Sequence, residues 1–256
     1  MNRTERVIEI DNVSFSYGEG TVLEKVNLTV NSGDFLAIVG PNGGGKTTLV
    51  KLILGLLKPV EGRIRVFGAE TAAALDRIAY VPQDTEFNRS FPITVREVVA
   101  MGKKASSKKF SFRRTAGREQ VEFWLSRLGL TDLSLNRLAA LSNGQRKRVF
   151  IARALCAEPS LLIMDEPLAS VDVESQELFF NILQEWRKRS TMIMVTHDTG
   201  VVARYVTSVV CVNRELVQHD SLRLDNETFE RVYGRHLQVM THGPVHVLHK
   251  KESESG

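Results

Sequence analysis

The sequence lacks a long hydrophobic run, since none of its apolar segments approaches the roughly 18–20 residues that a membrane-spanning helix needs. Residues 1–6 are mostly polar and lead directly into a strand-like pattern, so we expect no signal peptide. Cysteine is scarce as well: Cys156 and Cys211 are the only two, and both lie among apolar residues. This usage excludes a disulfide-stapled scaffold and favours small core residues in a reducing cytoplasm.

The chain also has no internal repeat and no large excess of one charge. Its 256 residues carry a formal net charge of +4, with a pI near 9.1 and 43% hydrophobic residues. These values are typical of a soluble globular protein with one large domain, or with a domain that carries an insertion. The positive charge permits anionic partners such as nucleic acid, lipid head groups or nucleotides, and it singles out none of them.

One strong motif is present, and it fits the phosphate-binding pattern G-x-x-x-x-G-K-[ST]. It consists of Gly40, Pro41, Asn42, Gly43, Gly44, Gly45, Lys46, Thr47 and Thr48. An apolar run at residues 35–39 predicts a buried strand before it, and residues 48–55 predict a helix after it. Glycines let backbone N–H groups approach phosphates, and the helix start adds partial positive charge. We therefore expect Lys46 to reach the outer phosphates of a nucleotide and the Thr47 hydroxyl to hold Mg²⁺.

Alternating apolar residues predict a β-rich layer around this motif. Residues 7–10, 13–17 and 22–30 are the expected strands before it, and residues 62–68 are a further strand after it. Tyr17 ends one of these strands just before a turn. An aromatic side chain there could stack on a base, although simple packing within the strand is the better explanation for the tyrosine taken alone.

A second group of polar residues follows the apolar run at residues 161–165. Asp165 ends this predicted strand and Glu166 comes next. Ligands gather at the carboxyl ends of buried parallel strands, and a carboxylate there suits Mg²⁺, which takes oxygen ligands. We expect Asp165 to bind the metal and Glu166 to orient or deprotonate an attacking water.

Two further predicted strands end in residues that could join this group. Gln83 ends the strand at residues 78–83, and His197 follows the strand at residues 191–196. The glutamine amide could contact a metal ion or a water, and the histidine is a candidate phosphate contact. A strand at residues 208–213 is predicted to be the last of the core, and the alternation with helices argues a mostly parallel sheet.

The middle of the chain changes in composition from about residue 84. Thr94 with Glu97 three residues later forms a capping-box pattern, and residues 119–130 have helical periodicity. Residues 102–118 hold seven Lys or Arg and no acid, which is typical of a solvated loop face. A surface that faces a membrane or an acidic partner is the other interpretation. The region is predicted to be an α-helical insertion in an α/β domain.

A second anion-ready helix start is predicted at residues 141–145. Ser142 is a natural N-cap for a helix at residues 146–157, and such a start offers free N–H groups to an anion. A further amphipathic helix is predicted at residues 173–189. Because one nucleotide needs only one phosphate loop, this second helix start has no obvious role within a single chain.

In this order the motifs resemble those of the ATP-binding subunit of ABC transporters, over residues 7 to about 233. The resemblance implies an α/β P-loop NTPase fold of ABC type: a mainly parallel core sheet, an N-terminal antiparallel β layer and an α-helical subdomain inserted at about 84–160. It leaves residues 234–256 as a C-terminal tail. The matching segments are residues 40–48 (Walker A), Gln83 (Q-loop), 141–145 (ABC signature), 161–165 (Walker B), Glu166 (catalytic glutamate), 170–172 (D-loop) and His197 (switch histidine).

The resemblance also implies roles for these residues and for partners. ATP and Mg²⁺ are the expected cofactors, with Tyr17 stacking on adenine, and Thr47, Gln83 and Asp165 near the metal. Two chains would form a head-to-tail dimer, in which one chain's signature and D-loop bind the nucleotide held by the other chain's phosphate loop. The residues so implied are Ser142, Gly144, Gln145 and Asp172.

The same resemblance places the chain at the cytoplasmic face of a membrane, bound through its helical insertion to a separate permease. One departure concerns the signature, where Asn143 stands at a position that is usually glycine. Asparagine tolerates left-handed backbone angles better than other non-glycine residues, so we expect function to be kept.

The transported substrate is implied by a more local resemblance. Residues 91–102 and 212–214 are similar to segments of zinc and manganese importers, which also use an extracytoplasmic metal-binding protein. Iron-siderophore and cobalamin importers have a similar segment and are the second interpretation. An ABC ATPase that acts on nucleic acid is a third, although such proteins usually carry paired ATPase domains or long coiled coils. A non-catalytic binding module would not need Lys46, Asp165, Glu166 and His197 together.

Four late histidines raise the question of a metal site in the tail. They are His236, His242, His246 and His249. Histidine-rich tracts can bind metal, but this spacing matches no defined site, and a solvated tail is the simpler interpretation.

Overall fold

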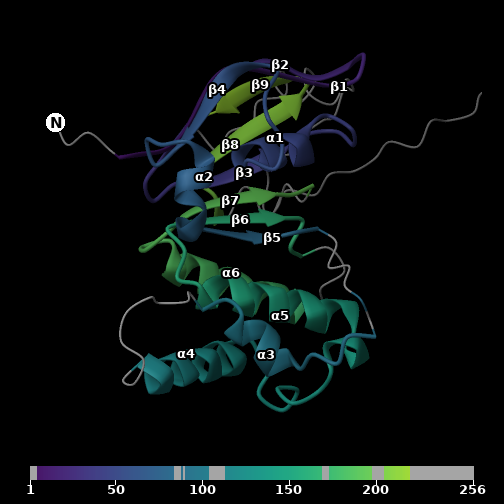
Figure 1. Cartoon of the computed structure of the whole chain (residues 1–256), viewed down its shortest axis with the longest axis vertical. Coiled ribbons are helices and arrows are strands. Elements are labelled where there is room, and N and C mark those ends of the chain that lie inside the picture. The colour runs from purple at the N-terminus through teal and green to yellow at the C-terminus, as the bar shows by residue number, and fades with distance from the viewer. Residues whose placement is uncertain are drawn as a thin grey trace, which may run out of the picture.

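The computed structural model describes residues 5–83, 88, 90–103, 113–168, 173–197 and 205–219. In this part of the chain two β-sheets and a layer of helices are stacked on one another (Figure 1). The strands are β1 (Arg6–Tyr17), β2 (Gly20–Asn31), β3 (Phe35–Val39), β4 (Glu61–Val66), β5 (Ile78–Val81), β6 (Leu161–Asp165), β7 (Thr191–Val195), β8 (Ser208–Asn213) and β9 (Glu215–His219). The α-helices are α1 (Lys46–Ile53), α2 (Thr71–Ala74), α3 (Val95–Ala100), α4 (Arg113–Arg127), α5 (Asn143–Cys156) and α6 (Val173–Trp186).

The core sheet has six strands in the order β5-β6-β7-β3-β8-β9. All neighbouring pairs are parallel except β8 and β9, which form an antiparallel pair at one edge. Strands β3, β6 and β7 are buried along their whole length, as expected for parallel strands covered on both faces. The ends of β5, β6 and β7 that bear the predicted site residues therefore lie at one edge of this sheet.

Alternate residues of each core strand face two different hydrophobic cores. In β6, Leu161 and Ile163 pack with α1 and the antiparallel sheet, while Leu162 and Met164 pack with the helices on the other side. This period of two is set by the pleat of the strand. Consequently α1 lies on one face of the core sheet, whereas α5 and α6 lie on the opposite face (Figure 1).

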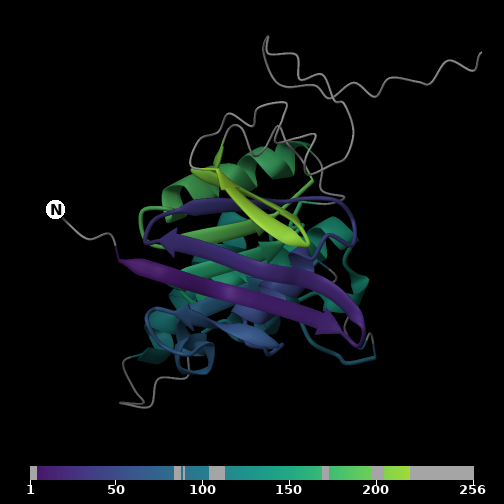
Figure 2. The ribbon, with the colours of Figure 1, turned by 90° about the horizontal axis from the view of Figure 1, so that it is seen from above.

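The antiparallel sheet, in the order β2-β1-β4, covers α1. From above, the long strands β1 and β2 cross the core sheet as an outer layer (Figure 2). The N-terminal antiparallel layer and the mainly parallel core sheet predicted from the sequence are both confirmed. The sequence suggested two short strands in place of β1. Strand β1 has register shifts between Ile10, Val13 and Phe15, and these interrupt its alternating pattern.

The helical insertion packs α3 against α4 and α5. Thr94 caps α3, and a full capping box with Glu97 is present, as the sequence predicted. The backbone N–H and the hydroxyl of Thr94 both bond to the Glu97 carboxylate and lower the pKa of that group. The segment between α4 and α5 is tied back to α3, since the N–H of Val95 donates to the carbonyl of Asn136 at 3.0 Å.

Some boundaries differ from the sequence prediction, each for a local reason. Helix α1 begins at Lys46, two residues earlier than expected, because Gly45 serves as its N-cap. Helix α5 begins at Asn143 because Ser142 and Gln145 form a capping box. Strand β9 was missed, and β8 is therefore not the last strand of the core. The five residues of β9 follow β8 after one residue, Arg214, which has a positive φ of 62°.

Candidate functional site

The phosphate loop runs from β3 to α1, and its glycines are required where it packs on neighbouring backbone. A Cβ atom added to Gly40 would lie 2.1 Å from the carbonyl oxygen of Val212 in β8. Gly45 has φ of 103°, and a Cβ atom there would lie 2.8 Å from Cδ2 of Leu23. The course of this loop therefore depends on residues that have no side chain.

Lys46 is buried inside the loop, with only 6% of its surface exposed. Its Nζ donates to the carbonyl oxygens of Gly40 at 3.0 Å and Pro41 at 2.9 Å. Burial lowers the pKa of Lys46, and the negative charges of Glu166 and Asp165 act in the opposite direction. The loop thus holds a cation at a point where phosphate oxygens, which carry more negative charge than carbonyls, could accept its hydrogen bonds.

Asp165 and Thr47 meet where β6 ends and α1 begins. The Thr47 hydroxyl donates to Oδ2 of Asp165 at 3.2 Å. The other oxygen, Oδ1, is buried and has no hydrogen-bond partner among the described residues. Burial is the main cause that raises the pKa of Asp165, which is 1% exposed. A buried oxygen without a donor, next to a hydroxyl, is a donor set that suits a hard cation such as Mg²⁺.

Glu166 is held on both carboxylate oxygens by residues that follow neighbouring strands. Nε2 of Gln83 donates to Oε2 at 2.9 Å, and Nε2 of His197 pairs with Oε1. The backbone of Glu166 has φ of 46°, which is uncommon for a residue with a side chain. Its N–H donates to the carbonyl of Val195 at 3.0 Å. Three residues that the sequence placed at three separate strand ends therefore form one hydrogen-bonded group.

Tyr17 is half exposed at the end of β1 and contacts Phe15 edge-on, with ring centroids 4.9 Å apart. Its exposed ring is available to a planar ligand, so its predicted stacking on adenine stays a prediction.

The residues around Ser142 form a separate part of the predicted site. The Ser142 hydroxyl accepts from the N–H of Gln145 at 3.2 Å, and the Gln145 side chain accepts from the N–H of Ser142 at 3.0 Å. Asn143 lies inside α5 and has no positive φ, so left-handed tolerance is not what this position needs. Instead its Oδ1 accepts from Arg146. Helices α5 and α1 lie on opposite faces of the core sheet (Figure 1), so the two helix starts approach the sheet from different sides.

Several predicted positions lie outside the described residues. They are residues 170–172, which include Asp172, residues 104–112 of the basic stretch 102–118, and the tail with its four histidines. Within the described residues, no cluster of three or more His, Cys, Asp or Glu side chains is placed to hold a metal ion. None of the helices described combines the length and the hydropathy of a membrane span.

Sequence reasoning missed two residues that the structure brings to the site. Val212 supplies the carbonyl that limits Gly40, and Lys147 donates from Nζ to the backbone carbonyl of Glu166 at 3.0 Å. Lys147 belongs to a run of basic residues at the start of α5, and nothing in its spacing distinguishes it from its neighbours. Its burial, at 9% exposure, is the feature that marks it, and burial is a tertiary property.

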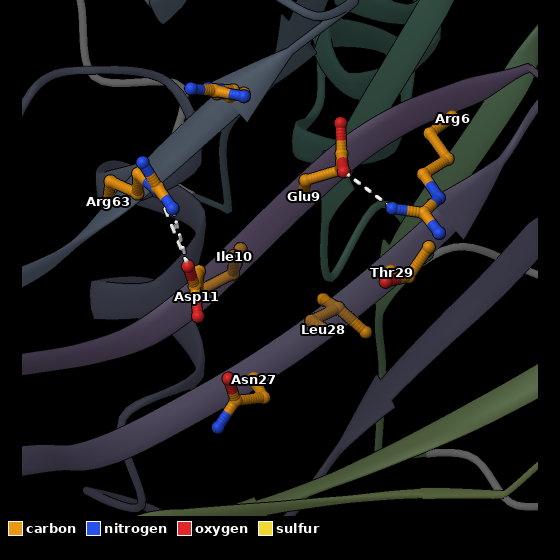
Figure 3. A pocket seen from close by; sticks show the side chains of 9 residues that line it. Arg6, Glu9, Ile10, Asp11, Asn27, Leu28, Thr29 and Arg63 are labelled. Carbon is orange, nitrogen blue, oxygen red and sulfur yellow. Dashed lines mark hydrogen bonds and ion pairs between the residues drawn. The ribbon is translucent and has the colours of Figure 1, made fainter.

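A shallow pocket of about 330 Å³ lies elsewhere, on the outer face of the antiparallel sheet (Figure 3). Arg6 pairs with Glu9, and Arg63 pairs with Asp11, so most of its charged groups already have partners. These pairs are largely exposed, where ion pairs contribute little. The pocket shares no residue with the loop or with the strand ends, and it has no part in the site described above.

Comparisons with known proteins agree on one family. A family profile described as ABC transporter matches residues 23–169. A zinc uptake system ATP-binding protein of Listeria innocua is 40% identical, over 83% of this chain and 84% of the relative. A manganese transport system ATP-binding protein of Halalkalibacterium halodurans is 36% identical, over 83% of this chain and 85% of the relative.

Solved structures agree in fold. The chain is similar, with a TM-score of 0.78 and 26% identity, to a metal-chelate type ABC transporter in an inward-facing conformation, over 96% of this chain and 98% of the other. It is also similar to an ATP-binding cassette in a dimeric post-hydrolysis state with ADP and phosphate bound, with a TM-score of 0.74 and 26% identity. That match covers 84% of this chain and 99% of the other.

Proposed function

The chain belongs to the ABC transporter family of ATP-binding proteins, and from this premise we propose that it powers import of zinc or manganese through a separate membrane permease. As a member of this family it binds ATP and hydrolyses it. The observation that supports the assignment of the catalytic site best is the meeting of Gln83, Glu166 and His197 beside the phosphate loop.

Nucleotide binding is assigned to the phosphate loop and to Tyr17. Lys46 and the N–H groups at the start of α1 would hold the β- and γ-phosphates, because both carry positive charge toward the same place. The exposed ring of Tyr17 would stack on the adenine. The glycines between residues 40 and 45 matter here because they let the phosphates come close to the backbone.

Mg²⁺ is the cofactor that fits the polar atoms next to the loop. The unpartnered Oδ1 of Asp165 and the hydroxyl of Thr47 would hold it, with the side-chain oxygen of Gln83 nearby. Bound there, the ion would neutralise the negative charge that develops on the phosphates during transfer. The raised pKa of Asp165 agrees with a carboxylate that gains from a nearby cation, because burial without one disfavours its charge.

The hydrolytic step is assigned to Glu166 and His197. The Glu166 carboxylate is fixed between the Gln83 amide and the His197 ring, so it is positioned to orient a water and to accept its proton. His197 is partly exposed and would contact the γ-phosphate. Positioning and charge stabilisation provide most of the acceleration in phosphoryl transfer, and this group supplies both.

A second copy of the chain is needed to explain the start of α5. Members of this family act as dimers. We propose a head-to-tail dimer in which Ser142, Gly144 and Gln145 contact the nucleotide of the partner, together with Asp172. The position of α5 on the face of the core sheet opposite to α1 supports this arrangement, because one chain cannot easily use both helix starts on one nucleotide.

We assign binding of the permease, at the cytoplasmic face of the membrane, to the helical insertion. Phe91, Met101 and Leu135 expose large apolar side chains in or beside the segment that carries α3. Exposed large apolar side chains are a feature of interaction surfaces. We propose in addition an extracytoplasmic metal-binding protein that delivers the ion. The zinc and manganese relatives favour a metal ion over a siderophore or cobalamin, and they also favour transport over action on nucleic acid.

The elemental content of cells tests this function. Cells that lack the gene are complemented with the wild type, with Glu166→Gln or with Glu158→Gln, which alters an exposed glutamate that also has φ of 46°. In limiting metal, we expect zinc or manganese to fall in the Glu166→Gln cells alone. A fall in iron that depends on added siderophore would favour the second interpretation. Unchanged metal content without a compensating importer would contradict metal import.

A further inference from the structure

Lys147 is a buried cation whose ammonium group contacts Glu166, the residue assigned as the catalytic base. It lies in α5, is 9% exposed, and donates from Nζ to the backbone carbonyl oxygen of Glu166 at 3.0 Å. Lysine is rarely buried to this extent, because removing an ammonium group from water costs free energy unless polar partners replace the water. A buried lysine bonded to the residue assigned as the catalytic base therefore calls for an explanation.

The backbone of Glu166 needs to be held from outside. With φ of 46°, a residue that carries a side chain is in a strained conformation, which persists only when its surroundings impose it. Its N–H is fixed by the carbonyl of Val195, the last residue of β7, at 3.0 Å. Its carbonyl is fixed by Lys147 from α5. The two peptide groups that determine the direction of the Glu166 side chain are thus held by two different elements.

We propose that Lys147 is a positioning residue, which keeps the Glu166 backbone in its left-handed conformation and so aims the carboxylate at the water. This inference rests on the function proposed above. Lys147 does not touch the reacting atoms; it acts through the carbonyl of Glu166. When the hydrogen bond is lost, the carboxylate is free to leave the place where Gln83 and His197 hold it.

Helix α5 does not depend on this hydrogen bond for its own position. Its apolar face is packed into the helix-side core through Val149, Ile151 and Leu155, which are at most 2% exposed. Arg148, the next residue, fixes the helix to the end of α4 by donating from Nη1 to the carbonyl of Leu128 at 3.2 Å. The Lys147 bond is therefore a contact to the site that is made in addition to the packing of the helix.

The position of Lys147 also links Glu166 to the start of α5. Ser142 caps that helix five residues before Lys147, or about 7.5 Å along the axis at 1.5 Å per residue. A helix turn is rigid on this length, so a shift of the capped end is carried to the Glu166 carbonyl. The proposed partner contact at Ser142 and the proposed catalytic base at Glu166 are joined by one lysine.

The test compares two variants of neighbouring residues in the full-length chain. Lys147→Met removes the ammonium and keeps an apolar stem of similar length. Arg148→Met is the matched control, because it removes a cation-to-carbonyl hydrogen bond from the same helix without touching Glu166. Each change is made in the wild type and in Glu166→Gln, and kcat, KM for ATP and thermal unfolding are measured. If Lys147→Met does not fold, Lys147→Gln serves instead, since its amide ends one bond short.

We expect Lys147→Met to lower kcat by about 10–100-fold, the scale of a small misplacement of a catalytic group, with KM changed by less than about twofold. In the Glu166→Gln background the same change is expected to alter kcat by less than about twofold, because the base it positions is gone. Arg148→Met is expected to keep kcat in both backgrounds.

Three results would overturn the inference: a loss in kcat below about fivefold, an equal loss in the Glu166→Gln background, or an equal loss with Arg148→Met. Even if the Lys147 inference fails, the proposed ATPase site stands when the wild-type chain hydrolyses ATP and Glu166→Gln abolishes this activity. A wild-type chain without ATPase activity would contradict both the site and the role of Lys147.

Discussion

The phosphate loop and the three residues at the strand ends lie side by side, yet the loop is formed by closely packed backbone and the strand-end site by side chains. In the loop, backbone atoms pack so closely that Gly40 has no room for a Cβ atom against Val212. At the strand ends, Gln83, Glu166 and His197 bond through their side chains. One region therefore depends on shape and the other on functional groups.

This difference determines what a substitution does in each region. A larger residue in the loop should disturb the fold and the binding of phosphates together, because the same backbone serves both. An isosteric change at the strand ends should leave the fold and nucleotide binding intact and remove the chemistry. Substitutions in the two regions can therefore be told apart by measuring unfolding, ATP binding and turnover separately.

Glu166→Gln should have the largest effect. We expect kcat to fall by about 10²-fold or more, the range for a lost general base, because an amide cannot accept the proton of the attacking water. ATP affinity and thermal stability should stay close to those of the wild type, since size is preserved and Lys46 is untouched. Phosphate release and calorimetric titration of ATP measure the two quantities. Near-normal turnover in this variant would remove Glu166 from its assigned role.

Gly40→Ala should act on the fold and on binding together. The added Cβ atom would meet the Val212 carbonyl oxygen at 2.1 Å, so the loop or β8 must move. We expect the free energy of unfolding to fall by about 1–3 kcal/mol, as for overpacked sites, and ATP binding to weaken with it. Gly20→Ala is the control, because the nearest atom to a Cβ added there, the carbonyl oxygen of Tyr17, is 3.6 Å away. Equal stability of the two variants in denaturant would show that the loop adapts to a side chain.

Thr47→Val tests the boundary between the two regions, where the loop meets Asp165. Losing the hydroxyl removes one oxygen ligand and the bond to Asp165. We expect the Mg²⁺ concentration for half-maximal ATPase activity to rise about tenfold, the scale of one hydrogen bond to a charged group. Thr131→Val, at an exposed position, is the control. An unchanged Mg²⁺ requirement would exclude Thr47 from the metal site.

Ser142→Ala should have the smallest effect. It removes the hydroxyl that caps α5, and we expect the free energy of unfolding to fall by about 1 kcal/mol when measured without nucleotide. Ser142→Thr keeps the capping oxygen and should restore most of the loss. If the Thr variant is as unstable as the Ala variant, the cap is not the source of the effect.

Local patterns in the sequence predicted many elements closely. The bounds of β3, β6 and β8 are those expected from apolar runs, and the capping box at Thr94 marked the start of α3. Strand β9 was missed because it follows β8 after a single residue, and its pairing depends on the neighbour it returns to. The roles of Tyr17 and of the start of α5 stay predictions.

The sequence by itself determined the loop motif, the polar residues at the strand ends and their order along the chain, because glycine patterns and apolar periodicity are properties of neighbouring residues. Only the tertiary structure decided that Gln83, Glu166 and His197 meet, although Gln83 and Glu166 are 83 residues apart. It also decided that Lys147 is buried against the Glu166 carbonyl. Strand order and burial follow from how all elements pack together, which no local pattern encodes.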